Sequence, residues 1–270
     1  LWKASALEAI TELVDNGYSV FEVPVSSPHC WPVEMSTAGR SDVRATLDAA
    51  GAEIRSLNAG GYDLNLASPA ASMRSKSIEH IASVIDLAAE WNVREIIISP
   101  GTRRPMISPT LEQVHGWLYE SLDVLIPRAK HAGTRLLFEQ TPYCFTPTID
   151  TLAKVVRTVD DDAVRIVYDV ANAAYIGEDP VAALREYHEL IPLIHISDTG
   201  TETWGHDPIG TGVIDWRSLG EAVDATVGAD NVVLEVIRDE NTLEEFATAV
   251  RDLGAAGWNL GSDRTEEVAR

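Results

Sequence analysis

The sequence predicts an α/β fold, and within that class we expect a (β/α)8 barrel. Helical and strand patterns alternate along the whole chain, and each of seven strand patterns is followed by a helical one, as in proteins with parallel strands and crossover helices. Several strands are continuous apolar runs, which is typical of strands buried on both faces. No glycine-rich dinucleotide fingerprint follows a strand, which disfavours the competing open doubly wound sheet.

The first elements have clear start and stop signals. Apolar residues at helical spacing predict a helix over 4–16, closed by an Asn-Gly pair in the manner of a C-cap. A strand follows over 18–25 and ends among prolines. The next helix, over 42–50, stops at a glycine, and the strand over 53–58 leads into a Gly-Gly turn.

The middle of the chain repeats this rhythm with longer helices. An amphipathic pattern predicts a helix over 72–91, and the apolar run EIIIS predicts a buried strand over 95–99. A helix over 109–132 ends before Gly133, and RLLFE forms the strand over 135–139. The remaining elements follow from the same patterns: helices over 149–159, 180–190, 215–227 and 242–253, and strands over 165–169, 193–197 and 232–236.

We expect one barrel domain over residues 1–260, because no change in composition marks a boundary, and barrels of about this length are commonly single domains. The residues from 261 to 270 are polar and predict a loose tail. The chain starts abruptly in a helical pattern at Leu1. The first strand of the barrel is therefore expected upstream of Leu1.

Composition excludes two classes of partner. The 42 acidic and 21 basic residues give a formal charge of −21, which repels nucleic acids and anionic membranes. Two cysteines, Cys30 and Cys144, do not make a disulfide framework, so a reducing, cytoplasmic setting is expected. No apolar run approaches the roughly 18 residues of a membrane span, and no signal peptide is visible.

Four strand patterns carry one ionisable residue at or near their C-terminal ends: Glu139, Asp169, His195 and Glu235. Each has an ordinary alternative, since a polar residue often closes a strand and a single histidine is often a core residue. In a parallel barrel, however, these strand ends meet at the face that holds the active site. Three carboxylates at one place repel one another unless a cation neutralises them. We therefore predict one divalent metal ion, with Mn²⁺, Co²⁺ or Zn²⁺ favoured and Mg²⁺ possible.

Further residues near the same face are candidates for substrate binding. His206 lies in a polar, glycine-containing loop after His195 and could contact a substrate hydroxyl or act as another ligand, unless the loop is merely flexible surface. Arg103 and Arg104 could grip a phosphate or carboxylate, although two solvated arginines are the simpler interpretation. Tyr62, with Trp204, could line a sugar ring.

The segments GYSVFEV, LLFEQTP, IVYDVANA, LIHISDT followed by HDPIGTGVIDW, and VVLEV together resemble the xylose isomerase-like barrel superfamily. The similarity is greatest to its sugar (phosphate) isomerases and epimerases. It implies that Glu139, Asp169, His195 and Glu235 are metal ligands and that Glu139 and Glu235 are the acid–base pair. It also implies dimers or tetramers.

The chain departs from two patterns within that superfamily. Epimerases of free ketoses carry His three residues after the aspartate ligand and Arg six after the histidine ligand, where this chain has Asn172 and Thr201. We place Asn172 among the substrate-binding residues. Barrels of the endonuclease IV type resemble YDLNLASP, but their three-zinc site needs histidines where this chain has Ser99 and Asn172.

These observations predict an isomerase or epimerase of carbohydrate metabolism that acts on a sugar, sugar phosphate or related keto-polyol. The reaction would be proton transfer next to a carbonyl, through an enediolate. A lyase that dehydrates a keto-cyclitol or a dehydroshikimate-like compound on the same site is the alternative. A phosphodiesterase of the endonuclease IV type and a non-catalytic binding protein are less favoured.

Overall fold

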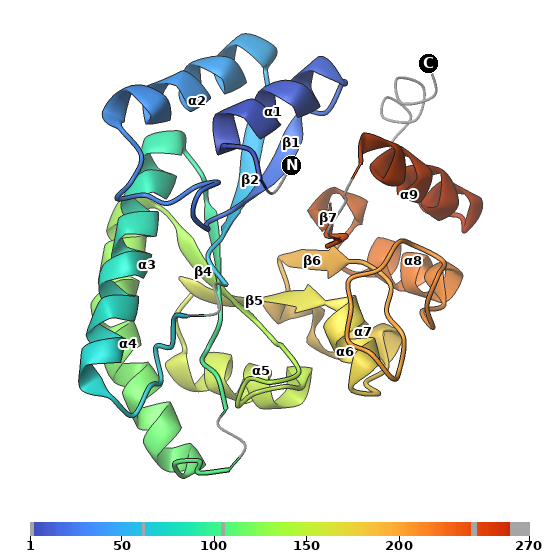
Figure 1. The fold of residues 1–270 in the computed structure, drawn as a ribbon. Coiled ribbons are helices and arrows are strands. Elements are labelled where there is room, and N and C mark those ends of the chain that lie inside the picture. Colours follow the sequence, from blue (N-terminus) through green and yellow to red (C-terminus); the bar gives the residue numbers. More distant parts are fainter. Residues whose placement is uncertain (1–2, 61–62, 104–105, 239–241, 260–270) are drawn as a thin grey trace. The chain divides into compact units, whose positions relative to one another are not determined.

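A computed structural model describes residues 3–60, 63–103, 106–238 and 242–259 of the protein (Figure 1). Helices and strands alternate along this part of the chain, as the sequence predicts. In chain order the elements are α1 (Ala6–Asp15), β1 (Val20–Pro24), α2 (Thr37–Ala50), β2 (Glu53–Asn58), α3 (Ala71–Trp91), β3 (Glu95–Ile98), α4 (Leu111–Ala132), β4 (Arg135–Glu139), α5 (Ile149–Val159), β5 (Val164–Asp169), α6 (Val170–Tyr175), α7 (Pro180–Tyr187), a 3₁₀ turn (His188–Leu190), β6 (Leu193–Ile196), α8 (Trp216–Ala225), a second 3₁₀ turn (Ala229–Asn231), β7 (Val232–Leu234) and α9 (Leu243–Ala255).

The strands form one seven-stranded sheet whose spatial order, β1 to β7, follows the sequence without a reversal. Neighbouring strands pair in parallel from β1 through β4 and again from β5 through β7. A doubly wound sheet would reverse its strand order at a switch point, whereas sequential parallel strands with intervening helices are the arrangement of a (β/α) barrel. The predicted fold class is therefore confirmed.

The residue contacts group the chain into two units. The first contains residues 1–139, 143–145 and 155–165. Its core lies along β2 and β3, where Leu57, Ile96, Ile97 and Ile98 are buried, and helices α3 and α4 pack against each other. All four residues of β3 are buried, as the apolar run EIIIS predicts.

The second unit contains residues 140–142, 146–154 and 166–270. All four residues of β6 are buried, and α7 packs against α8. The rings of Trp216 and Trp258 lie 6.1 Å apart, and Trp258 Nε1 donates a 2.7 Å hydrogen bond to the carbonyl of Trp216. This bond ties the segment after α9 to the start of α8.

Several elements differ from the prediction. Helix α2 begins at Thr37 rather than at residue 42, because Ser36 caps it by accepting a hydrogen bond from the Gly39 N–H. The short helix α6 is missing from the prediction. The helical pattern over 180–190 gives α7 followed by a 3₁₀ turn, and β7 ends at Leu234, before Glu235.

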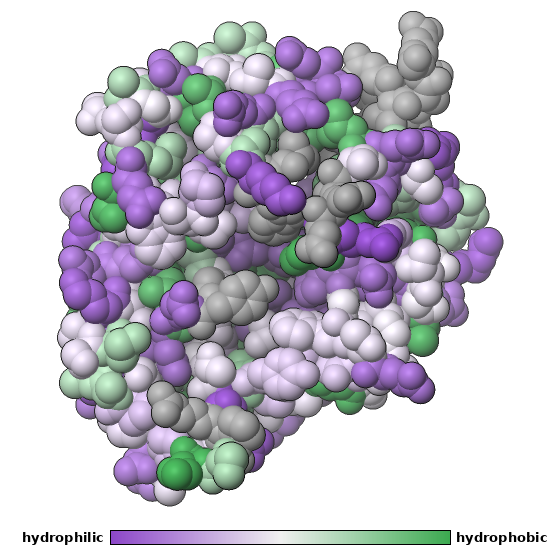
Figure 2. Space-filling model, in the orientation of Figure 1, coloured by the Kyte–Doolittle hydropathy of each residue, from purple (hydrophilic) through white to green (hydrophobic). Residues whose placement is uncertain are grey.

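The described surface shows no large hydrophobic area on the face drawn in Figure 2, where hydrophobic side chains occur in small separate groups. Among the described residues, none of the helices combines the length and the hydropathy that a membrane crossing requires. The predicted tail over 261–270 lies outside the described residues.

Candidate metal centre

Asp169 is the last residue of β5 and also the N-cap of α6. Its Oδ1 accepts a 2.6 Å hydrogen bond from the Asn172 N–H. Its Oδ2 is buried and accepts no hydrogen bond from the residues that the structure describes. An ionised oxygen in that position is costly unless a cation or proton reaches it, so Asp169 Oδ2 is suited to bind a metal ion.

His195 and Glu235 lie on the two neighbouring strand ends. The parallel register pairs Asp169 with His195, and the Glu235 N–H donates to the carbonyl of Ile196 at 2.9 Å. As a result the side chains of His195 and Glu235 meet, with His195 Nδ1 3.0 Å from Glu235 Oε2. Both residues are largely buried, which keeps this contact dry.

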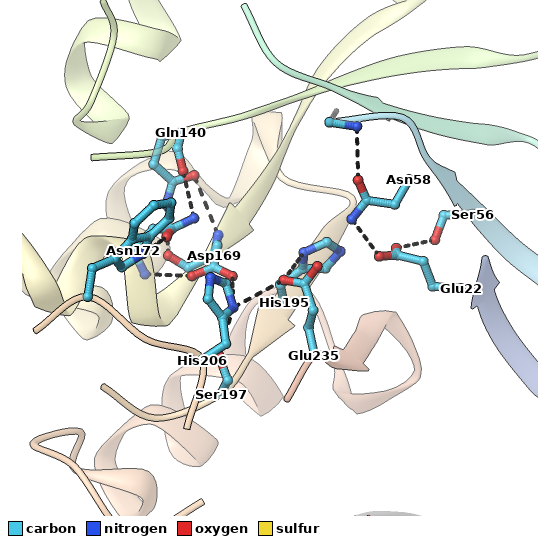
Figure 3. A network of polar contacts seen from close by, with 12 residues as sticks. Glu22, Ser56, Asn58, Gln140, Asp169, Asn172, His195, Ser197, His206 and Glu235 are labelled. Carbon is cyan, nitrogen blue, oxygen red and sulfur yellow. Dashed lines mark hydrogen bonds and ion pairs between the residues drawn. The ribbon is translucent and has the colours of Figure 1, made fainter. Parts of the chain in front are cut away.

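His206 reaches the same place from the loop after β6 (Figure 3). Its Nδ1 lies 3.2 Å from Ser197 Oγ, 3.4 Å from Glu235 Oε2 and 3.6 Å from Asp169 Oδ2. Two antiparallel bridges, Asp198 with Asp207 and His206 with Ile237, hold this part of the loop against the strand ends. His206 therefore lies beside Asp169 and Glu235, and its contact with a substrate hydroxyl or a metal ion stays a prediction.

The two carboxylates of this unit differ in proton affinity. Burial raises the pKa of Asp169 to about 6, although the neighbouring His206 opposes the shift. Burial also acts to raise the pKa of Glu235, but the charges and hydrogen bonds of His195 and His206 outweigh it and lower that pKa below its usual range. The ionised form of Glu235 is thus stabilised by imidazoles, while Asp169 lacks enough positive charge nearby.

The side chains fit a divalent cation. Asp169, His195 and Glu235 each offer one ligand atom, and these atoms lie within 4.8 Å of one another. Carboxylate oxygens together with an imidazole nitrogen suit Mn²⁺, Co²⁺ or Zn²⁺. A cation here would also meet the buried Oδ2 of Asp169, so this group of residues could hold a metal ion.

Glu139, the other predicted ligand, is buried at the end of β4. The next residue, Gln140, bonds to the backbone of Asp169 in both directions. Its Nε2 donates to the Asp169 carbonyl at 2.8 Å, and its Oε1 accepts from the Asp169 N–H at 3.4 Å. Gln140 therefore joins the backbone that follows Glu139 to the end of β5.

Asn172, predicted to bind substrate, is buried beside Asp169 and hydrogen-bonds within the protein. Its Nδ2 donates to the carbonyl of Gln140 at 3.0 Å, and its Oδ1 accepts from Trp204 Nε1 at 2.7 Å. Asn172 thus links Gln140 to the loop that carries His206 (Figure 3). Its contact with substrate stays a prediction.

The remaining predicted residues lie elsewhere or outside the described part of the chain. Arg103 has an exposed side chain, and its N–H donates to the carbonyl of Tyr143 at 3.0 Å. Arg104 and Tyr62 lie outside the described residues. The predicted grip on a phosphate or carboxylate stays a prediction for both arginines.

Sequence reasoning missed two polar groups. Asp198 is fully buried three residues after His195, and Glu22 bonds to Ser56 and Asn58 in the first unit. The available signals were an acidic residue directly after a buried strand and an acidic residue inside the apolar pattern VFEV. Both signals are common in surface positions as well, so neither is specific.

Two solved structures resemble this chain over almost its entire length. A D-tagatose 3-epimerase-like protein has a TM-score of 0.81 and 18% identity, with 99% of this chain and 98% of that chain covered. The 3-keto-D-glucoside 4-epimerase from E. coli has a TM-score of 0.78 and 22% identity, with 93% and 94% covered. At these identities the similarity shows a shared fold.

Curated relatives match over a shorter stretch. The inosose dehydratase of Geobacillus kaustophilus is 27% identical over 100 residues, which cover 36% of this chain and 32% of that protein. The matched stretch thus spans about a third of the relative's length. The profile of one family, by contrast, matches this chain from residue 10 to residue 256. With nearly all of its strands and helices inside that match, the chain belongs to the xylose isomerase-like TIM barrel family.

Proposed function

We propose that this protein is a divalent-metal-dependent isomerase or epimerase of a sugar or a related keto-polyol. One observation carries the proposal: Asp169, His195 and Glu235 each offer a ligand atom, and these atoms lie within 4.8 Å of one another. We propose these three residues, together with the predicted ligand Glu139, as the ligands of one Mn²⁺, Co²⁺ or Zn²⁺ ion. The epimerases among the structures of the same fold support this choice of reaction.

Glu139 and Glu235 are the proposed acid–base pair. One carboxylate removes the proton from the carbon next to the substrate carbonyl, and the other returns a proton to the opposite face or to the adjacent carbon. His195 and His206 lower the pKa of Glu235, so its carboxylate is ionised before the substrate binds. A bound divalent ion would polarise the carbonyl and offset the negative charge of the enediolate.

His206 is the proposed partner of a substrate hydroxyl. Its imidazole contacts Ser197, Glu235 and Asp169, so it can donate or accept a hydrogen bond at the edge of the ligand group. Trp204, whose ring lies 6.1 Å from that of His206, provides an apolar surface beside it. Such a pair suits the hydroxyl and C–H faces of a sugar ring.

Dehydration is the second candidate, and the similarity to the inosose dehydratases of Geobacillus kaustophilus and Clostridium beijerinckii favours it. The first step would be the same removal of a proton next to a carbonyl. A hydroxyl on the neighbouring carbon would then leave as water instead of a proton returning. Product mass separates the two candidates, because dehydration loses water and epimerisation conserves mass.

The test is turnover by the Mn²⁺-loaded protein of D-tagatose, D-psicose, D-fructose, L-ribulose, a 3-keto-D-glucoside and an inosose, followed by mass spectrometry in D₂O. Epimerisation predicts incorporation of one deuterium, and dehydration predicts loss of water. Glu139→Gln and Glu235→Gln should each lower kcat at least about a thousandfold, as expected when a general acid–base group is removed.

Asp162→Asn is the matched control, because the Asp162 side chain is 99% exposed and its charge lies on the surface. This variant should keep wild-type turnover. Wild-type turnover by either glutamine variant would refute the proposed acid–base pair, and no turnover of any of these compounds by the wild-type protein would refute the proposed substrate class.

A further inference from the structure

Glu22, Ser56 and Asn58 form a polar network in the first unit that the proposed metal site does not use (Figure 3). The register pairs Glu22 with Ser56 and Pro24 with Asn58, and side chains two residues apart on a strand share a face. Ser56 Oγ donates to Glu22 Oε2 at 2.6 Å, and Asn58 Nδ2 donates to Glu22 Oε1 at 2.9 Å. Both oxygens of Glu22 are therefore engaged.

This network fixes the backbone directly after β2. Asn58 Oδ1 accepts a 3.1 Å hydrogen bond from the Gly60 N–H, while its Nδ2 is held by Glu22. Because both ends of the Asn58 amide are bonded, the peptide at Gly60 has little freedom to shift. The hydrogen bonds from Asn58 to Glu22 and from Gly60 to Asn58 thus hold the backbone at Gly60 in place.

Gly60 in turn lies beside Glu139. A β-carbon built on Gly60 would be 3.6 Å from Glu139 Oε2 and 3.1 Å from Asn58 Oδ1. Gly60 does not have the positive φ that favours glycine, unlike Gly51 or Gly101. Its backbone would accept an alanine, so the missing side chain matters for space rather than for conformation.

We propose that Gly60 is a specificity-determining position, whose missing side chain leaves room for substrate next to the Glu139 carboxylate. A carboxylate that moves a proton must come within about 2.6–3.2 Å of its partner atom. A methyl group on residue 60 would lie 3.6 Å from Glu139 Oε2 and would fill space that a substrate atom needs to reach this oxygen. This inference rests on the proposed role of Glu139 in the reaction.

Gly60→Ala tests the inference, with Gly116→Ala as the control, because a β-carbon at Gly116 meets nothing within 4 Å. Both variants should bind Mn²⁺, followed by calorimetry, within about twofold of the wild-type affinity. Gly60→Ala should lower kcat/KM at least tenfold on the best of the sugars named above, mainly through KM. The loss should be larger for six-carbon ketoses than for L-ribulose. Gly116→Ala should leave kcat/KM unchanged.

A second comparison covers the case in which Gly60→Ala does not fold. Asn58→Ala removes the oxygen that lies 3.1 Å from the added methyl group, so the methyl fits easily in Asn58→Ala/Gly60→Ala. The double variant should still be at least tenfold less active than Asn58→Ala alone, because the methyl group stays next to Glu139. Equal activity of these two proteins, or of Gly60→Ala and wild type, would overturn the inference while the proposed function stands. No turnover by the wild-type protein would overturn both.

Discussion

Asp198 organises the loop that brings His206 to the candidate metal centre. Its Oδ1 accepts hydrogen bonds from the N–H groups of Thr199 and Ile214, and its Oδ2 accepts from the Gly210 N–H and Trp216 Nε1. One buried carboxylate therefore joins the start of the loop to its end and to α8. Hydrogen bonds to a charged group contribute about 1.5–3 kcal/mol each, so this arrangement is strongly favoured over an open loop.

Gly212 is required for that arrangement. A β-carbon on Gly212 would meet Asp198 Oδ1 and the carbonyl of Thr199 at distances too short for a real contact. Only glycine therefore allows the backbone at residue 212 to lie this close to Asp198 and Thr199.

Gly212→Ala should displace the loop, lower turnover at least tenfold and lower the free energy of unfolding by about 1–3 kcal/mol, as overpacking does. Gly254→Ala is the control, since a β-carbon there meets nothing within 4 Å. Enzyme assays and urea unfolding of both variants check the prediction. Wild-type turnover by Gly212→Ala would contradict the role of the loop.

At the scale of elements, the starts of helices were harder to predict than their existence. Helix α2 begins five residues earlier than expected because a serine N-cap lies in a segment rich in serine and proline, which favours a loop. Helix α6 has only six residues, too few for an apolar period to show. Its N-cap is Asp169, so one side chain starts a helix and faces the candidate metal centre at the same time.

The strand ends were predictable for a physical reason. Parallel neighbouring strands bring their C-terminal ends to one edge, so RIVYD and LIHIS place Asp169 beside His195 once their register is set. The bond between Trp204 and Asn172 could not be predicted in the same way. It depends on the path of a loop more than 30 residues away in sequence, which no local pattern specifies.

The N-terminal part of β3 carries a buried ion-pair group. Glu95 is fully buried and contacts both Arg55, at 2.5 Å, and Arg135, from the strands on either side. Removing both cations would leave a buried carboxylate without compensation, which is strongly unfavourable. This group therefore stabilises the β2–β3–β4 part of the sheet.

Arg55→Met/Arg135→Met should lower the free energy of unfolding by about 3–5 kcal/mol. The exposed pair Lys76–Glu79 provides the control, because Lys76→Met removes an ion pair whose partners are 74% and 69% exposed. This variant should unfold at nearly the same urea concentration as the wild type, because water screens an exposed ion pair. Urea titrations measure both effects. If Arg55→Met/Arg135→Met were as stable as Lys76→Met, the two arginines would not be what offsets the buried charge of Glu95.

At the scale of the whole molecule, a divalent ion should stabilise the fold. Ligand atoms from separate strands are scattered once the chain unfolds, so the ion binds the folded state selectively. At a free concentration one hundred times Kd this contributes about 2.7 kcal/mol, which corresponds to a rise in Tm of about 5–10 °C for a chain of this size.

Calorimetric scans with and without Mn²⁺, after treatment with a chelator, check this prediction. The rise in Tm should disappear in Asp169→Asn and persist in Asp162→Asn, whose carboxylate is exposed. If Mn²⁺ raised the Tm of the wild-type protein and of Asp169→Asn equally, the stabilisation would come from another part of this acidic chain.

The bond from Trp204 to Asn172 and the hydrogen bonds of Asp198 hold the loop over residues 199–214 at several points. Swinging residues 199–214 outward would break the Trp204–Asn172 bond, the two antiparallel bridges and the hydrogen bonds of Asp198 together. We therefore expect this segment to stay in place if the protein turns over a substrate, so that substrate and product would pass by another route.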